Sequence, residues 1–213
     1  MSNETRAERL RQASHERRER EKQELRQAIH EAAGELFLEH GYQEFSLRQV
    51  AEAIGYSPGT IYLYFNDKDD LLFSVADEGF FKFGQALSQA AAGTGDARQR
   101  LVDMARAYVD FGLENPEHYQ LMFMQRTDYL LERPQQDLRP RIDSFQILQT
   151  AVEQAIAAGV LRAGDSLAIA DTIWAQFHGI VALAIGMPGF YTPERARNAV
   201  DQAVTVMIEG LRP

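Results

Sequence analysis

Residues 46–65 constrain the fold of this chain more than any other stretch. Over residues 47–54 apolar side chains recur every three or four positions, so they share one side of a helix of about two turns. Gly55 follows where a helix commonly ends in the left-handed conformation, which glycine adopts without steric cost. Ser57 can cap a second helix, and Pro58 has the backbone angle that a first helical turn requires. Two short helices joined by a glycine turn form a helix-turn-helix, whose second helix can enter the major groove of DNA.

Further capping signals mark the neighbouring helix ends. Ser46, with Gln49 three residues later, has the pattern of a capping box at the start of the first of these two helices. After the second helix, Asn66 is expected to cap a longer helix. Asp67 and Asp69 would lie in its first turn, where the helix dipole favours acids.

The chain before residue 46 is expected to hold one core helix and an exposed arm. Apolar side chains recur at helical spacing over residues 24–40, and Gly41 is expected to end this helix. Residues 1–23 alternate Arg with Glu and hold almost no large apolar residue, which is typical of a solvated helix or a disordered arm. Two interpretations stay open: an arm that follows DNA, or a solvated extension that helps to start the first helix.

Residues 26–72 resemble the DNA-binding domain of the tetracycline-repressor (TetR) family. The resemblance is carried, in chain order, by Ala32–Phe37, His40–Tyr42, Ser46–Ile54, Ser57–Phe65 and Lys68–Leu72. One departure is Tyr64, because the position before the final Phe is often His in the family; a tyrosine hydroxyl can still donate to a phosphate. The resemblance implies a homodimer that binds a palindromic operator in double-stranded DNA.

The same resemblance implies which residues contact DNA. They are Arg48, Ser57, Gly59, Thr60, Tyr62, Tyr64 and Lys68. Tyr62 would touch base edges and thymine methyl groups, Arg48 could reach a phosphate or a guanine edge, and the others would bind phosphates or allow close backbone approach. For Tyr62 and Tyr64 the alternative is packing against the first helix. Ile61 and Phe65 are predicted to be buried.

The remainder of the chain shows helical patterns and no β-pattern. The predicted fold class is therefore all-α, with an N-terminal three-helix domain that contains the helix-turn-helix and a C-terminal helical domain for ligand binding and dimerisation. The small-residue run 90–95 is the clearest break. The predicted domains are a charged arm (1–23), a DNA-binding domain with its linking helix (24–92), and a regulatory and dimerisation domain (93–213). Helices are expected over residues 96–114, 116–123, 140–158, 165–187 and 193–211.

The last two expected helices indicate an oligomer. The helix over 165–187 has large apolar residues on one side and small residues on the other, and a helix apolar on two sides has to be covered on both. Pairing it and the final helix with their copies about a two-fold axis gives a four-helix bundle. The predicted dimerisation residues are Ala175, Gly179, Ala182, Gly186, Ala199, Ala203 and Val206. The alternative is that both sides are core within one chain.

Aromatic and other apolar residues of the C-terminal part are candidates to wall a pocket for a small-molecule effector. Such pockets combine apolar walls with a few polar tips. The candidates are Tyr108, Phe111, Met122, Phe145, Trp174, Phe177 and His178. The alternative is ordinary core, and His178 could be either the polar group inside the pocket or a satisfied core histidine. The run from Trp174 to Gly179 also resembles the Trp-His-Gly signature of one TetR subgroup.

Composition and motifs argue against other classes of protein. The 213-residue chain has no cysteine, which excludes disulfides and cysteine nucleophiles. The five histidines are scattered, and there is no Gly-rich phosphate loop or nucleophile elbow, so no catalytic residue, metal or cofactor is predicted. The stretch 174–190 is too interrupted to span a bilayer, and the N-terminus does not resemble a signal peptide. The expected location is the cytoplasm.

The charge distribution qualifies the expected DNA binding. The net charge is −9, and residues 1–80 hold ten basic and sixteen acidic side chains. Because many of these acids can face away from DNA, we expect modest non-specific affinity rather than no binding. The leading hypothesis is a repressor that a small, largely apolar effector releases from its operator. The alternative is a ligand-independent DNA-binding or architectural protein whose C-terminal domain only dimerises.

Overall fold

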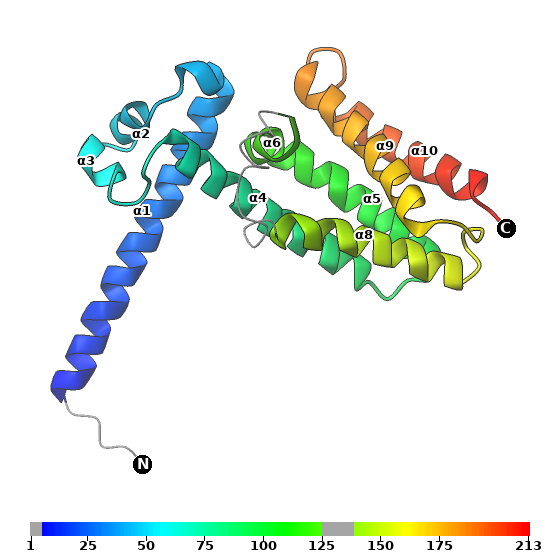
Figure 1. The fold of residues 1–213 in the computed structure, drawn as a ribbon, viewed down its shortest axis with the longest axis horizontal. Helices are drawn as coiled ribbons and strands as arrows, with labels where there is room; N and C mark the ends of the chain where they lie inside the picture. The colour runs from blue at the N-terminus through cyan, green and yellow to red at the C-terminus, as the bar shows by residue number, and fades with distance from the viewer. Residues whose placement is uncertain (1–5, 125–138) are drawn as a thin grey trace. The chain divides into compact units, whose positions relative to one another are not determined.

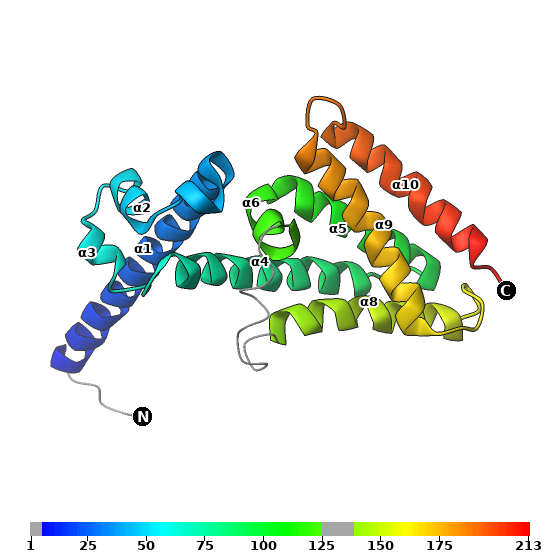
Figure 2. The same ribbon diagram turned by 45° about the horizontal axis from the view of Figure 1, so that its top comes forward.

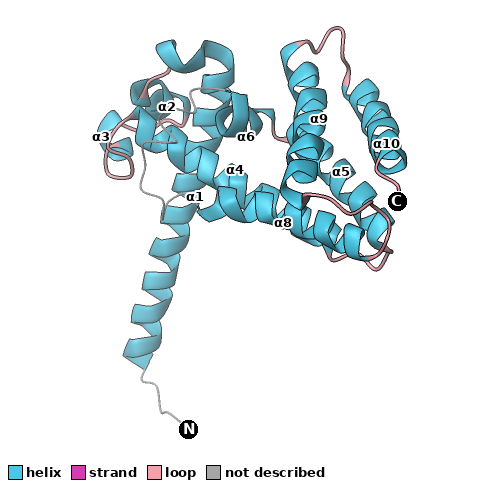
Figure 3. Cartoon of the chain, turned by 45° about the vertical axis from the view of Figure 1, so that its right-hand side comes forward, coloured by secondary structure: helices cyan, strands magenta, loops and turns pink. Residues whose placement is uncertain are grey.

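The computed structural model describes the backbone of residues 6–124 and 139–213 and the side chains of residues 11–124 and 143–213. Within these ranges all regular structure is helical and there is no strand, as predicted (Figures 1 and 3). The elements are α1 (Arg6–Glu44), α2 (Leu47–Ala53), α3 (Pro58–Ile61), α4 (Lys68–Ala91), α5 (Ala97–Glu114), α6 (Pro116–Tyr119), a π-helical turn (Gln120–Met124), α8 (Arg139–Ala157), α9 (Ser166–Gly186) and α10 (Pro193–Gly210).

The chain forms two compact units, Met1–Val75 and Ala76–Pro213. The division lies inside α4, whereas the sequence analysis placed the whole linking helix with the first unit. The physical reason is that Phe80, Phe83 and Leu87 of α4 are buried in the apolar core of the second unit. α4 is therefore one continuous helix with residues in both units.

The first unit packs α1, α2, α3 and the start of α4 around a small apolar core. Ile29 and Phe37 of α1, Val50 of α2 and Ile61 of α3 are all buried there, as their helical spacing predicts. The arm before residue 24 is helical from Arg6 and continues α1 as one helix (Figure 1), whose residues 11–23 are exposed. Of the two predicted states of the arm, solvated helix or disorder, the structure has the helix.

The turns of the first unit follow the capping chemistry, with three differences in detail. Gly41, with a φ of 69°, forms a kink within α1, so the helical segment predicted to end there is followed by a further short helical stretch. Gly55 has a φ of 73° after α2, which glycine adopts without steric cost. Ser46 caps α2 as predicted, because its side-chain oxygen accepts from the backbone N–H of Gln49 at 3.4 Å. The Ser46 hydroxyl also donates to the side-chain oxygen of Gln49 at 2.7 Å, so the reciprocal half of a capping box is missing. The predicted cap of α4 was wrong by one residue: Asp67 Oδ1 accepts from the backbone N–H of Asp70 at 2.8 Å.

The second unit is a bundle in which α5 packs against α8, α9 and α10. Figure 2 shows α9 and α10 lying side by side, joined by a short loop. Asp96, Asp165 and Thr192 cap α5, α9 and α10 with their side chains. Asn115 precedes the proline that opens α6, but its side chain makes no capping bond there.

We expect Gly112→Ala to destabilise the second unit by about 1–3 kcal/mol, because a Cβ atom here would clash with the side chain of Val181 and meet the ring of Tyr119 at 3.0 Å. Gly112 thus marks the close approach of α5 to α9 and α6. Gly210→Ala is the matched control, since its Cβ would meet no atom within 4 Å. Urea unfolding followed by circular dichroism measures both variants. Equal midpoints for the two would contradict the close packing at Gly112.

Candidate functional site

The helix-turn-helix of the first unit presents polar and aromatic side chains to solvent. Ser57 caps α3, with its oxygen 3.3 Å from the backbone nitrogen of Thr60 and 3.0 Å from the hydroxyl of Thr60. Ile61 and Phe65 are buried, as predicted. The side chain of Tyr62 is 59% exposed and follows directly after α3. The local sequence therefore anchors α3 through its apolar residues and leaves Tyr62 free to contact a partner.

The other predicted DNA-contacting residues also reach the surface to different extents. Arg48, Ser57 and Gly59 are exposed, and Thr60, Tyr64 and Lys68 are partly buried. Lys68 has a structural role as well, because its Nζ donates to the backbone carbonyl of Tyr42 at 2.9 Å and lies 4.1 Å from the centre of the Tyr42 ring.

Tyr42 was not among the predicted site residues. Its hydroxyl donates to Asp69 at 2.6 Å, so it connects the end of α1 to the start of α4 beside the helix-turn-helix. The signal that could have found it is the His-Gly-Tyr run, which the family resemblance already included.

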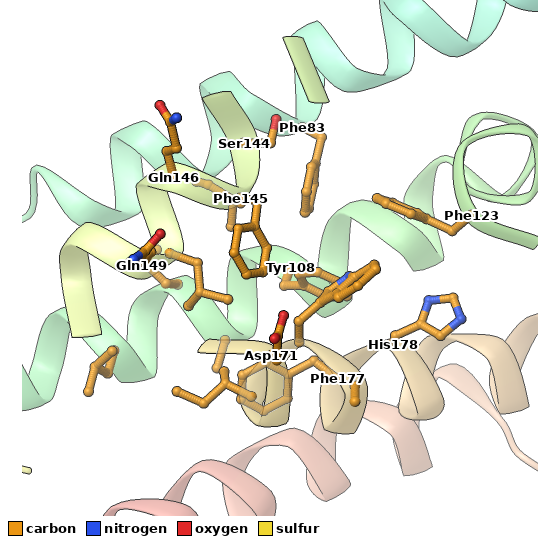
Figure 4. A pocket seen from close by; sticks show the side chains of 18 of the residues that line it. Phe83, Tyr108, Phe123, Ser144, Phe145, Gln146, Gln149, Asp171, Phe177 and His178 are labelled. Carbon is orange, nitrogen blue, oxygen red and sulfur yellow. The ribbon is translucent and has the colours of Figure 1, made fainter. Parts of the chain in front are cut away.

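The second unit contains a cavity of about 770 Å³. Figure 4 shows side chains of α4, α5, α8 and α9 converging on it, among them Phe83, Tyr108 and Phe145. Six of the seven predicted ligand-binding residues line it: Tyr108, Met122, Phe145, Trp174, Phe177 and His178. Phe111 does not; it packs in the core with its ring 5.1 Å from that of Phe83, which does line the cavity.

The cavity wall includes residues that the sequence analysis missed. They come mainly from α4, α5, α8 and α9, and they are Phe80, Phe83, Leu87, Leu101, Met104, Ala105, Phe123, Ser144, Gln146, Leu148, Gln149, Leu167, Asp171, Ile173 and Met207. Ala175, predicted as a dimerisation residue, also lies on this wall. Helical periodicity marked most of the apolar ones as buried, but it could not distinguish core from cavity lining.

A chain of hydrogen bonds crosses one side of the cavity. The hydroxyls of Tyr108 and Tyr119 are 2.9 Å apart, and that of Tyr119 is 2.8 Å from Nδ1 of His178. The rings of Tyr119 and His178 are stacked, with centroids 5.7 Å apart. Burial raises the pKa of both tyrosines and lowers the pKa of His178. At neutral pH both hydroxyls are therefore protonated and the imidazole is neutral.

The remaining polar residues of the cavity wall carry no positive charge. Ser144 is buried with its hydroxyl 3.4 Å from the carbonyl of Phe80, whereas Gln146 and Asp171 are exposed. Figure 4 shows Gln146 extending outward from α8. Neither lysine nor arginine is among the described lining residues. The described residues also hold no group of three or more metal-ligating side chains.

The outer side of α9 and α10 is apolar and uncovered in the single chain. A Cβ atom on Gly179 or Gly186 would meet no atom within 4 Å. Leu183 of α9, Val206 of α10 and Met187, which directly follows α9, are exposed. By length and composition, α9 is also the one helix in the described part of the chain that could cross a membrane, with 33% of its apolar window buried. The predicted dimerisation residues are all partly or fully exposed.

Comparison with known proteins places this arrangement in a family. Residues 29–75 match the family described as bacterial regulatory proteins of the tetR family. Residues 101–210 match the tetracyclin repressor-like C-terminal domain. The chain belongs to the TetR family of DNA-binding transcriptional regulators. The Trp-His-Gly subgroup within the TetR family stays a prediction.

Individual relatives agree with this assignment. The TetR-family chain is 34% identical over 97 residues to the transcriptional repressor AcnR of Corynebacterium glutamicum, covering 46% of this chain and 45% of AcnR. It is 31% identical over 101 residues to the transcriptional activator FasR of Mycolicibacterium smegmatis, covering 47% and 45%. These matches thus span about half the length of each relative.

A solved structure of similar fold covers more of the chain. It is a Rhodococcus protein described as having unknown function, with a TM-score of 0.73 and 29% identity over 89% of this chain and 96% of that one. The TetR family and the named relatives are transcriptional regulators and not enzymes, which confirms the prediction that this chain is not an enzyme.

Proposed function

We propose that the protein is a cytoplasmic homodimeric repressor that binds a palindromic operator and is released from it by a small, largely apolar effector. The observation that carries the effector is the cavity of about 770 Å³, whose wall is mostly aromatic and aliphatic. A protein whose second unit only dimerised would need no such space, so the cavity favours regulation by a ligand over the architectural alternative.

The dimer is supported by the uncovered side of α9 and α10. Small residues at Gly179 and Gly186 allow close approach of a second helix, and the exposed Leu183 and Val206 supply apolar area for it to bury. A two-fold dimer would present two copies of α3, which suits two operator half-sites. That AcnR is a repressor supports the repressor role, whereas FasR is an activator, so the direction of regulation has to be measured.

α4 offers a route for coupling the two activities. Its residues from Lys68 to Val75 belong to the first unit, and its residues Phe80, Phe83 and Leu87 wall the cavity. An effector that binds more tightly when α4 is in one position than in another increases the population of molecules with α4 in that position. The shift would change the separation of the two recognition helices and so the affinity for the operator.

We expect the emission of Trp174 to report effector entry. It is the single tryptophan of the chain, it lines the cavity, and its ring packs edge-on against Phe123 and Phe145. An effector should shift or quench this emission and release operator DNA with the same concentration dependence, because one binding event causes both. Fluorescence titration and fluorescence anisotropy of labelled operator measure the two responses. A compound that releases DNA without changing Trp174 emission would place the effector site elsewhere.

A further inference from the structure

The hydrogen-bond chain beside the cavity has a defined direction. Tyr108 and Tyr119 are 4% and 0% exposed, so each hydroxyl proton needs an acceptor inside the protein. Among the described residues, the Tyr108 hydroxyl forms one hydrogen bond, to the Tyr119 hydroxyl, and Tyr119 forms one more, to His178.

Three arrangements of the protons can be compared. If His178 donated from Nδ1 to Tyr119 and Tyr119 to Tyr108, the buried proton of Tyr108 would have no acceptor. If Tyr119 accepted from both neighbours, its own buried proton would have none. Donation from Tyr108 to Tyr119 and from Tyr119 to Nδ1 of His178 leaves no orphaned proton. In this arrangement Nδ1 is the acceptor and the neutral imidazole carries its proton on Nε2.

Nε2 of His178 is available to donate a hydrogen bond to a molecule bound in the cavity. It has no hydrogen-bond partner among the described residues, and it is not sealed from solvent, unlike Nε2 of His118. His178 is half-buried and lies on the cavity wall beside Phe123 (Figure 4). The imidazole thus presents one N–H donor in a wall that is otherwise mostly apolar.

The charges around the cavity decide what this donor can bind. The described lining residues include no lysine or arginine, and the one acid among them, Asp171, would repel an anion. Against the described lining residues a buried carboxylate would lose its hydration without gaining a cation, because the neutral imidazole of His178 carries no positive charge. An uncharged carbonyl oxygen has a smaller desolvation cost and accepts one hydrogen bond well.

We propose that the effector is an uncharged, largely apolar molecule with a carbonyl-type hydrogen-bond acceptor, which accepts from Nε2–H of His178. Tyr108 and Tyr119 are positioning residues, because they hold His178 in the tautomer that donates into the cavity. The proposal rests on the role of the cavity as the effector site, but it makes no use of operator binding. It can therefore be tested on the protein without DNA.

Methyl decanoate and decanoate are a matched pair of probes, since they share an acyl chain and differ in charge. We expect the full-length protein at neutral pH to bind the ester at least about tenfold more tightly than the carboxylate, measured by Trp174 emission and by calorimetry. His178→Phe should remove roughly tenfold of the affinity for the ester, and His178→Gln, which keeps an N–H donor, should restore part of it. Tyr191→Phe, outside the cavity lining, is the control and should bind the ester as the wild type does.

The positioning role needs a readout of its own. Long-range ¹H–¹⁵N spectra of the wild type should show Nε2 protonated and Nδ1 unprotonated, with the signal assigned by its loss in His178→Gln. Tyr119→Phe should yield a mixture of tautomers and bind the ester several-fold more weakly, with the fold preserved by circular dichroism. A proton on Nδ1 in the wild type, equal or tighter binding of decanoate, or binding of neither probe would each overturn the proposal. Loss of operator binding alone would overturn the regulatory proposal and leave this one standing.

Discussion

Leucine at both Gly179 and Gly186 should convert the proposed dimer into monomers while the chain stays folded. In the single chain a Cβ atom at either position meets no atom within 4 Å, so the added side chains strain nothing within one copy. Across a close two-fold interface each substitution acts twice. At about 1–3 kcal/mol for each overpacked position, the dimer would lose about 4 kcal/mol or more, roughly a thousandfold in its dissociation constant.

Sedimentation equilibrium and far-ultraviolet circular dichroism together measure this outcome. Ala157→Leu is the control, because it adds an apolar side chain at an exposed position of α8 instead of α9. The control should remain dimeric. A double variant that sediments as the wild-type dimer would show that this side of α9 is not the interface. A variant that loses helicity would show that the face packs within one chain.

Replacing Tyr62 with alanine should abolish most of the specific operator binding. Tyr62 is 59% exposed directly after α3, while Ile61 beside it is buried, so truncation removes a contact surface without opening the core. A lost base contact costs about 1–3 kcal/mol, and a symmetric operator doubles the loss, which gives about a hundredfold weaker binding. Thr60→Ala should also weaken operator binding, because Thr60 is predicted to contact a DNA phosphate. Its hydroxyl lies 3.0 Å from that of Ser57, which caps α3.

Gel-shift assays with DNA from around the protein's own gene provide the measurement, and sedimentation confirms that the dimer persists. Phe81→Ala is a suitable control, since Phe81 is an exposed aromatic residue of the second unit. If both Thr60→Ala and Tyr62→Ala bound as the wild type does, the assigned recognition helix would be wrong. If the control also lost binding, exposed aromatic area in general would explain the effect.

Local signals predicted most of the first unit correctly because α2 and α3 are short and their ends are determined by residues adjacent in the sequence. Gly55 at a φ of 73° and Ser57 as the cap of α3 are decided within a few residues, and both were expected from the sequence. The miss at Asn66 has the same origin. Asn66 and Asp67 can both cap a helix, and the choice depended on Asn66 donating to Asp70 Oδ2 at 3.0 Å instead.

The sequence alone determined the helical class, the helix-turn-helix and six of the residues that line the cavity, because helical periodicity and capping are local properties. Tertiary structure alone decided which apolar residues line the cavity and which pack in the core. Phe111 and Phe177 both have helical spacing, yet packing against Phe83 keeps Phe111 off the cavity wall. Tyr119 joins His178 across 59 positions of sequence, and no periodicity encodes that bond. A hydrogen bond between distant residues depends on how the helices pack, so only the folded chain could reveal the bond between Tyr119 and His178.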